Sequence, residues 1–333
     1  MTTDIIVDLQ YGDCAKGKVA HHLCKSEPYT HVLRYNGGGN AGHTIYHEGK
    51  KFVTHQIPVG VFFGIRSIIG PGCVLNVRKF LEELQTLEAG GITIKDRIFV
   101  ANNTHIVTEE HLNEDSGETK IGTTRTGIGP AYRDKHARTG IRAGSIPELK
   151  PYLIDIYKEF HQNKNKVSIL CEGAQGFGLD IDWGDYPYVT SSHPTVAGAL
   201  LNGIPHTAVQ NVWGVGKIYE TYVGAKKFEP EDPIFPRIRE AGEEYGATTG
   251  RPRQCNWLHW DRLEKGIRFN AVTHLVLSKM DVLRTVNRWA VIVDDQQIDF
   301  DSEEKMKDWL VTRLVALNIP KENIFFSEHK DKI

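Results

Sequence analysis

The stretch that decides the fold is DIIVDLQYGDCAKGKVAHHLC, residues 4–24. Its apolar start is typical of a buried strand, and the residues from Val19 onward predict a helix. Between these two parts, Gly12, Gly17 and Lys18 fit the spacing G-x-x-x-x-G-K. In such loops, backbone N–H groups and the positive end of the following helix hold phosphates. The stretch therefore predicts a strand, a phosphate-binding loop and a helix, in the order of a nucleotide-binding fold.

This loop lacks one residue that phosphate-binding loops usually have. Val19 stands where a Ser or Thr hydroxyl normally holds magnesium, so the loop fits an ordinary P-loop nucleotidase only if another oxygen binds the metal. Asp13 lies in the same loop and carries a suitable carboxylate. A glycine turn with solvated lysines is the alternative interpretation of this loop.

Further short, apolar, β-branched runs recur along the chain and predict more strands. Several show no alternation of apolar and polar residues, as expected of strands that are covered on both faces. The predicted strands are residues 4–9, 31–35, 66–70, 97–101, 167–172, 274–279 and 289–293. The predicted helices include residues 77–89 and 304–317. The sequence thus predicts an α/β protein with a mainly parallel central sheet flanked by helices.

The chain shows no internal repeat and no Pro/Gly/Ser-rich linker, so we expect a single domain over residues 1–333 with a helical and loop insertion at about 103–165. Long glycine-rich loops should follow the strands, and open α/β sheets bind their ligands at such strand ends. These loops are predicted at residues 36–42, 122–130, 173–184 and 246–250.

The composition excludes several classes of protein. Lys and Arg number 40 against 42 for Asp and Glu, which gives no general attraction for nucleic acid or anionic membranes. The five cysteines are odd in number and never spaced as CxxC, which favours a reduced cytoplasm over a disulfide framework or a zinc site. No leader sequence and no run of about 18 apolar residues is evident. We therefore expect a cytoplasmic protein.

A second nucleotide signature lies near the other end of the chain. The predicted strand that starts at residue 274 leads into Ser278, Lys279, Met280 and Asp281, close to the Asn/Thr-Lys-x-Asp pattern of guanine-nucleotide proteins. An aspartate placed edge-on accepts hydrogen bonds from the ring N–H and the amine of guanine, which adenine cannot donate. A solvated strand end is the alternative for this short motif.

Several blocks then occur in a fixed order: YGDCAKGK (11–18), NGGGNAGHT (36–44), KIGTTRTGIGPAYRDKHARTG (120–140), CEGAQGFGLDIDWGDYPYVTSS (171–192), YGATTGRPR (245–253) and SKMD (278–281). This series resembles the adenylosuccinate synthetase family, and the short chain is similar to its archaeal and viral members. The resemblance implies a homodimeric, Mg²⁺-dependent α/β ligase. In that family GTP phosphorylates the six-oxygen of IMP, after which the amine of aspartate displaces the phosphate.

The resemblance also implies catalytic roles. Asp13 would take the proton from ring nitrogen one and help to bind Mg²⁺. His43 would donate to phosphate oxygens as charge develops, and Gln175 would contact the six-oxygen. The backbone carbonyl of Gly42 would be a further metal ligand. The alternative interpretations are a turn histidine and a capping aspartate.

Three sets of binding residues follow from the same resemblance. The set for the nucleoside triphosphate is Gly12, Lys16, Gly17, Lys18, Gly42, Thr44, Lys279 and Asp281. The set for the purine monophosphate is Asp13, Asn40, Thr123, Thr124, Arg138, Gln175, Thr190, Val223 and Arg251. The set for aspartate is Thr248, Thr249, Arg251 and Arg253, because arginine forks and hydroxyls suit carboxylates.

Arg138 is implied to reach the nucleotide of the neighbouring subunit, so that dimerisation completes the site. The chain departs from the family pattern at Cys14 and Ala15, where Glu-Gly is usual. It departs again at Lys226 and Lys227, where Gly-Pro is usual, and near Glu328, in a segment that helps to enclose guanine in the family. GTP is the favoured donor, and ATP or dATP is the alternative that these departures leave open.

The acceptor purine also stays open at this point. Asp13 is retained, which favours IMP over dGMP or GMP as the acceptor. In the alternative, the same reaction on dGMP would give 2-amino-2'-deoxy-N6-succinyladenylate for aminoadenine DNA, and a viral protein would act in the host cytoplasm. A catalytically inactive nucleotide sensor and a nucleotide kinase are further alternatives. The paired arginines Arg251 and Arg253 argue against both, because neither needs an aspartate site.

Overall fold

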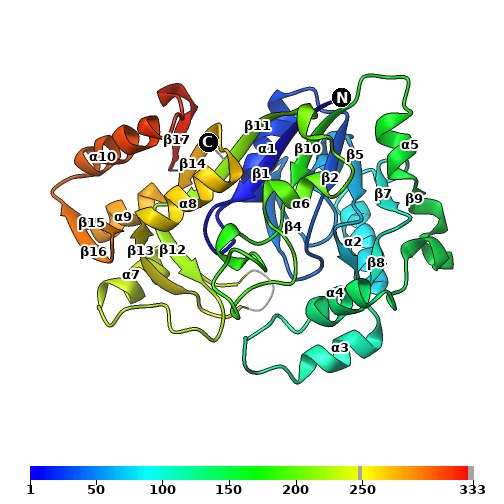
Figure 1. Ribbon diagram of the computed structural model, residues 1–333, viewed down its shortest axis with the longest axis horizontal. Coiled ribbons are helices and arrows are strands. Elements are labelled where there is room, and N and C mark those ends of the chain that lie inside the picture. Colours follow the sequence, from blue (N-terminus) through cyan, green and yellow to red (C-terminus); the bar gives the residue numbers. More distant parts are fainter. Residues whose placement is uncertain (247–249, 329–333) are drawn as a thin grey trace.

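The computed structural model describes residues 1–246 and 250–328 and has a nine-stranded sheet at its centre (Figure 1). Each neighbouring pair of strands in this sheet is parallel. In the order in which they lie side by side, the strands are β17 (Ile324–Ser327), β14 (His274–Ser278), β11 (Val209–Lys217), β1 (Thr2–Asp8), β10 (Ser168–Glu172), β2 (His31–Arg34), β5 (Arg66–Ile69), β7 (Ile98–Ala101) and β9 (Leu153–Ile154). The predicted α/β class with a parallel sheet is confirmed.

Helices flank this sheet on both faces. The α-helices are α1 (Lys16–Ser26), α2 (Val77–Ala89), α3 (Glu109–Ser116), α4 (Ile128–Ala137), α5 (Ile156–His161), α6 (Val196–Leu200), α7 (Ile234–Ala241), α8 (Trp260–Asn270), α9 (Met280–Val286) and α10 (Glu303–Ala316). Short 3₁₀ helices are η1 (Val59–Phe63), η2 (Ala143–Ser145), η3 (Pro147–Tyr152), η4 (Phe177–Leu179), η5 (His206–Ala208) and η6 (Lys321–Asn323). None of the helices in the described part of the chain has the length and apolar character needed to cross a membrane.

The side chains of β1 explain why the strand sequences do not alternate. Ile5 and Val7 pack in one buried cluster, which also contains Leu263 of α8. Ile6 packs in a second cluster, together with Val19 of α1. Because both faces of the strand are covered, the central positions Ile5, Ile6 and Val7 are all apolar, as in other parallel sheets.

Three smaller sheets accompany the central one. A four-stranded sheet has the order β12 (Tyr219–Tyr222), β13 (Gln254–His259), β15 (Trp289–Val293) and β16 (Gln296–Phe300), so the predicted strand 289–293 belongs to this sheet. A hairpin is formed by β3 (His43–His47) and β4 (Lys50–Thr54), and β6 (Val74–Leu75) pairs with β8 (His105–Ile106). Several of these strands are short and polar, and they were not predicted from the sequence.

The strand β11 was also missed, although it lies beside β1 near the middle of the sheet. Its sequence VQNVWGVGK mixes polar residues and glycines with apolar ones, so it contains no apolar run that would predict a strand. Gly214 is required by packing, because a Cβ there would lie 2.8 Å from the Leu9 side chain and 2.9 Å from that of Val272. Close packing of neighbouring elements therefore overrides the low strand propensity of glycine.

The carboxyl ends of the central strands position the candidate site. The glycine-rich stretches at 36–42 and 173–184 follow β2 and β10, as predicted. The stretches at 122–130 and 246–250 do not follow strands of the central sheet: the first connects α3 to α4, and the second lies between α7 and β13. That part of the prediction was wrong, because glycine-rich loops also connect helices.

The segment predicted as an insertion, about residues 103–165, contains α3, α4 and α5. In Figure 1 the helices α3 and α4 lie together at the lower edge of the molecule. The short strand β9 in the same segment returns to the central sheet and pairs with β7. The bounds of the insertion stay a prediction.

Candidate active site

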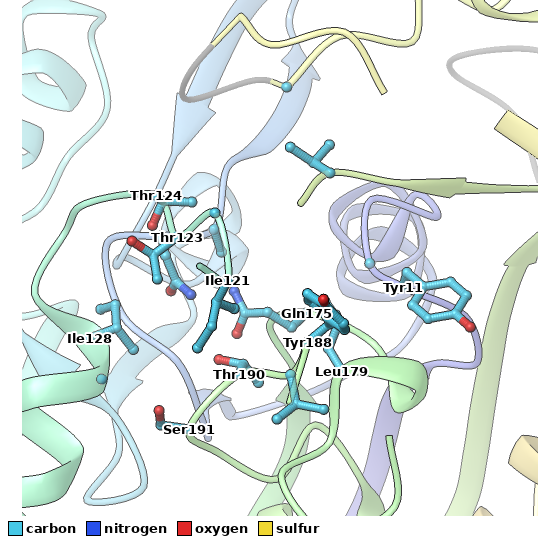
Figure 2. Close-up of a pocket in the computed structure, with 18 of the residues that line it drawn as sticks. Tyr11, Ile121, Thr123, Thr124, Ile128, Gln175, Leu179, Tyr188, Thr190 and Ser191 are labelled. Atoms are coloured by element: carbon cyan, nitrogen blue, oxygen red, sulfur yellow. The ribbon is translucent and has the colours of Figure 1, made fainter. Parts of the chain in front are cut away.

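A cavity of about 490 Å³ lies beyond the carboxyl ends of β1, β2 and β10. Figure 2 shows Thr123, Thr124, Gln175 and Thr190 around one space, although they come from three separate loops. The predicted site residues that line the cavity are Gly12, Asp13, Lys16, Asn40, Gly42, His43, Thr123, Thr124, Gln175, Thr190, Val223, Arg251 and Arg253. Each of the three predicted binding sets thus has members at the same cavity.

Other predicted residues lie away from its lining. These are Gly17, Lys18, Thr44, Arg138, Lys279 and Asp281. Lys18 donates to the hydroxyl of Ser327, and Lys279 Nζ donates to the backbone carbonyl of Gly242 at 2.7 Å. Gly17 has a packing role, because a Cβ there would lie 2.8 Å from the His43 Cβ. Thr248 and Thr249 lie outside the described residues.

A buried carboxylate organises the phosphate loop. Asp8, at the end of β1, accepts hydrogen bonds from the N–H groups of Gln10, Gly12 and Cys14 at 3.0, 3.2 and 3.1 Å. Asp8 also forms an ion pair with the Lys16 ammonium at 2.9 Å, and both side chains are almost fully buried. The loop therefore has a fixed shape, and Lys16 already has a counter-charge before any phosphate binds. From the sequence, Asp8 is predicted only as part of a strand.

The His43 ring is held by residues that the sequence analysis did not single out. Its Nδ1 lies 2.5 Å from Glu172 Oε1, and Arg34 Nη1 binds the same carboxylate at 2.9 Å. Glu172 also accepts the Val59 N–H at 2.8 Å. Burial and the neighbouring Arg34 lower the pKa of His43 to about 4, so the ring is neutral at pH 7. An anion that binds beside the ring would raise this pKa.

Asp13 is paired with the arginine that was predicted to bind aspartate. Arg253 Nη2 lies 2.7 Å from Asp13 Oδ2, although the Asp13 side chain is still 42% exposed. Burial alone would raise the pKa of Asp13, but the charges of Arg253, Lys217 and Lys16 outweigh it and hold this pKa below its usual value. Asp13 is therefore a carboxylate at neutral pH, and it can bind a cation.

Arg251 connects the predicted aspartate loop to the predicted monophosphate loop. Its Nη1 and Nη2 both donate to the Gly122 carbonyl at 3.2 Å, and Nη2 also reaches the Thr123 carbonyl at 3.4 Å. The Thr123 hydroxyl in turn donates to Asp115 at 2.9 Å. These contacts place the two loops at one side of the cavity.

Glu118 occupies the backbone donors of the monophosphate loop. Its carboxylate accepts N–H groups at 2.6, 2.9, 3.1 and 3.5 Å from Lys120, Ile121, Gly122 and Thr123. The Ile121 N–H and its neighbours lower the pKa of Glu118. Successive N–H groups of this kind form an anion-binding concavity, which here holds an internal anion.

Gln175 has an unsatisfied oxygen. Within residues 1–246 and 250–328, its buried Oε1 has no hydrogen-bond partner. Buried polar atoms are normally paired, so an unpaired one at a cavity indicates a place for a ligand donor. The apolar and aromatic side chains of Tyr11, Leu179 and Tyr188 lie near Gln175 in Figure 2 and line the same cavity. This wall of the cavity was not predicted from the sequence, because scattered aromatic residues form no motif.

Comparison with known proteins decides the family. The family model described as adenylosuccinate synthetase matches residues 5–150 and 145–308. The chain belongs to the adenylosuccinate synthetase family. As predicted, it is a ligase of the adenylosuccinate synthetase type, which couples formation of a C–N bond to consumption of a nucleoside triphosphate.

Relatives from bacteria support this family membership. The adenylosuccinate synthetase of Phocaeicola vulgatus is 40% identical over 334 residues, which cover 85% of this chain and 78% of that protein. The enzyme of Chlorobium phaeobacteroides is 36% identical over 382 residues, which cover 94% of this chain and 88% of that protein.

Solved structures show the same fold. The fully ligated adenylosuccinate synthetase from Plasmodium falciparum has a TM-score of 0.85 and 28% identity, covering 98% of this chain and all of the other. The cyanophage S-2L succinoaminodeoxyadenylate synthetase (PurZ), bound to dGMP and dATP, has a TM-score of 0.74 and 24% identity, covering 98% and 91%. The second likeness shows the fold alone.

Cys14 and Ala15, which depart from the adenylosuccinate synthetase pattern, lie in the predicted phosphate loop. Ala15 adopts φ 76°, the left-handed conformation that glycine tolerates and that costs other residues about 1–2 kcal/mol. Cys14 is buried, and its Sγ lies 3.1 Å from Gln10 Oε1. The loop therefore keeps the backbone shape of a glycine-containing loop in spite of its extra side chains.

Two oxygens of the cavity suit the magnesium that adenylosuccinate synthetases use. The Asp13 carboxylate and the Gly42 backbone carbonyl belong to residues that line it, and hard oxygen ligands are what Mg²⁺ prefers. A separate group of possible metal ligands, Asp180, Asp182 and His193, has Asp180 already accepting two backbone N–H groups. The predicted pair at the cavity is therefore the better candidate.

Proposed function

We propose that this protein joins L-aspartate to carbon six of IMP, driven by transfer of the γ-phosphoryl group of GTP to the six-oxygen. One observation carries the proposal: the same cavity is lined by Asp13, His43, Gln175, Arg251 and Arg253. The side-chain oxygen of Gln175 has no hydrogen-bond partner among the described residues. A nucleotide sensor needs no aspartate site, and a nucleotide kinase needs neither arginine.

The reaction proceeds in two steps. Asp13 removes the proton from ring nitrogen one of IMP, which makes the six-oxygen a nucleophile toward the γ-phosphorus, and GDP leaves. The amine of aspartate then attacks carbon six, and the bond between that carbon and the phosphorylated oxygen breaks to release phosphate. His43 and the side-chain amide N–H groups of Gln175 would stabilise the oxygens that gain charge.

Magnesium, held by Asp13 and the Gly42 carbonyl, would supply positive charge to the transferring phosphoryl group. The residues around the triphosphate would be Gly12, Lys16, Gly17, Lys18 and Thr44, with Lys279 and Asp281 at the base of the donor. The monophosphate of the acceptor would contact Asn40, Thr123, Thr124 and Thr190, with Val223 near the ribose and Gln175 at the base. The aspartate loop would contribute Arg251, Arg253 and the two threonines between residues 247 and 250.

One assay tests the acceptor and the donor together. Phosphate release is measured with Mg²⁺, aspartate and either GTP or ATP, with IMP or dGMP as acceptor and aspartate omitted as the control. We expect turnover that depends on aspartate and is fastest with IMP and GTP. A preference for dGMP would contradict the proposed acceptor, and nucleoside diphosphate formation without aspartate would contradict the ligase reaction.

We further propose a cytoplasmic homodimer in which Arg138 completes the partner's site. Arg138 ends α4 in a left-handed conformation, is exposed and does not line the cavity of its own chain. All five cysteines are unpaired and buried, which fits a reducing compartment.

A mixing experiment tests the shared site. Asp13→Asn and Arg138→Ala should each be nearly inactive, but mixed dimers contain one site in which both residues are intact. We expect phosphate release to recover to a substantial part, up to about a quarter, of the wild-type rate after the two variants are mixed and allowed to exchange subunits. A mixture no more active than its components would remove Arg138 from the partner's site.

A further inference from the structure

Arg253 is anchored at one end by a single buried residue. Its Nη1 donates to Glu244 Oε2, and its backbone N–H donates to the Glu244 carbonyl at 2.9 Å. The Glu244 side chain is fully buried, and that of Arg253 is only 11% exposed. Glu244, which does not line the cavity, therefore fixes the guanidinium of Arg253, which does line it.

Glu244 is itself held firmly. Its Oε2 accepts the Lys217 ammonium at 2.8 Å, and its Oε1 accepts the Tyr219 hydroxyl at 2.7 Å. Lys217 also donates to the Thr221 hydroxyl at 2.8 Å and is 2% exposed. Because a buried charge without its partner is very unfavourable, this carboxylate has little freedom to turn elsewhere. The ends of β11 and β12 thus fix the direction of Arg253.

At the other edge of the guanidinium, formed by Nε and Nη2, only one of the two nitrogens has a hydrogen-bond partner among the residues that the structure describes. Nη2 donates to Asp13 at 2.7 Å, whereas the buried Nε has no partner in the described parts of the chain. The N–H bonds of Nε and Nη2 point the same way from the planar group and match the two oxygens of a carboxylate. A carboxylate that enters the cavity can take both donors at once, and Asp13 then gives up its share of Nη2.

We infer that Glu244, balanced by Lys217, is a positioning residue that presents the Nε–Nη2 edge of Arg253 to a carboxylate of the substrate aspartate. This inference rests on the proposed function, which supplies the identity of the carboxylate. Glu244 never touches the substrate. Its effect is to keep Nη1 occupied, so that the arginine offers the same edge in each catalytic cycle.

The test is the Glu244→Gln variant, which keeps the shape of the side chain and removes its charge. We expect KM for aspartate to rise at least tenfold, while KM for IMP and GTP and the kcat at saturating aspartate change less than about threefold. A role confined to holding the strands together would lower stability and active fraction without a selective effect on aspartate. An unchanged KM for aspartate overturns the inference.

The matched control is Glu229→Gln. Glu229 pairs with Arg239 and accepts the Cys255 N–H at 2.7 Å, so it supports the same strand, β13, without touching the Arg253 side chain. We expect this variant to keep the wild-type KM for aspartate. An equal rise in both variants would show that any loosened ion pair near β13 has this effect, and would also overturn the inference.

A second variant guards against misfolding. Glu244→Gln leaves Lys217 without a counter-charge, whereas Lys217→Met combined with Glu244→Gln leaves no unpaired buried charge. The double variant should show the same selective rise in KM for aspartate. If the wild-type protein itself lacks aspartate-dependent phosphate release, the proposed function fails; if it is active and neither variant shows the rise, the role of Glu244 alone fails.

Discussion

Asp13→Asn should lower kcat at least about a hundredfold, the usual contribution of a general base, without unfolding the protein. The amide has nearly the shape of the carboxylate but cannot take the proton from ring nitrogen one. Asp13 has φ 57°, a conformation that asparagine also tolerates, so backbone strain should not obscure the result. The measurement is phosphate release at saturating substrates, with circular dichroism and thermal melting to verify the fold.

A matched variant controls for the loss of negative charge in the cavity. Glu114 lines the same cavity, is exposed and pairs with Arg133. We expect Glu114→Gln to keep kcat within about a factor of three, because exposed ion pairs contribute little. If Asp13→Asn retained more than about a tenth of the wild-type rate, Asp13 would not be the base.

Arg253→Leu is expected to raise KM for aspartate by about a hundredfold or more. The reason is that loss of one partner from a hydrogen-bonded charge pair costs about 2–5 kcal/mol, and 1.4 kcal/mol corresponds to a tenfold change. Leucine fills part of the space but donates nothing to a carboxylate. Initial rates over a wide range of aspartate concentration, at saturating IMP and GTP, measure the effect.

The control for this variant is Arg239→Leu. Arg239 pairs with Glu229 and donates to the Arg253 carbonyl at 2.6 Å, so it supports the same segment without lining the cavity. We expect Arg239→Leu to lower stability more than aspartate binding. Equal aspartate dependence in Arg253→Leu and in the wild-type protein would remove Arg253 from the site.

The elements whose bounds were predicted best are helices that begin at a capping residue visible in the sequence. Helix α2 has the predicted bounds, because Asn76 caps it through the Lys79 N–H and its apolar side is buried against the sheet. Helix α10 spans Glu303–Ala316 rather than 304–317, starting after its cap Ser302. Strand β11 escaped prediction, since its glycines are needed only by contacts with residues far away in the sequence.

The candidate site shows the same limit. The motifs brought out Asp13, Gln175 and the arginines, and these line one cavity. The carboxylates that hold the functional groups were not predicted, because each meets its partner only after folding: Glu172 lies 129 residues from His43 in the sequence. One amino-acid sequence contains no local pattern that predicts which carboxylate will pair with a residue far along the chain.

The contact between Asp13 and Arg253 has a consequence for how the substrates bind together. In the proposed reaction, the acceptor purine uses the Asp13 carboxylate and aspartate uses Nη2 of Arg253, so each substrate has to open the same internal ion pair. Whichever substrate binds first has opened that pair, and the second then binds without this cost. By thermodynamic linkage, each substrate therefore raises the affinity for the other by the same factor. With the proposed roles of Asp13 and Arg253, we therefore expect the complex that holds both substrates to be favoured over complexes that hold only one.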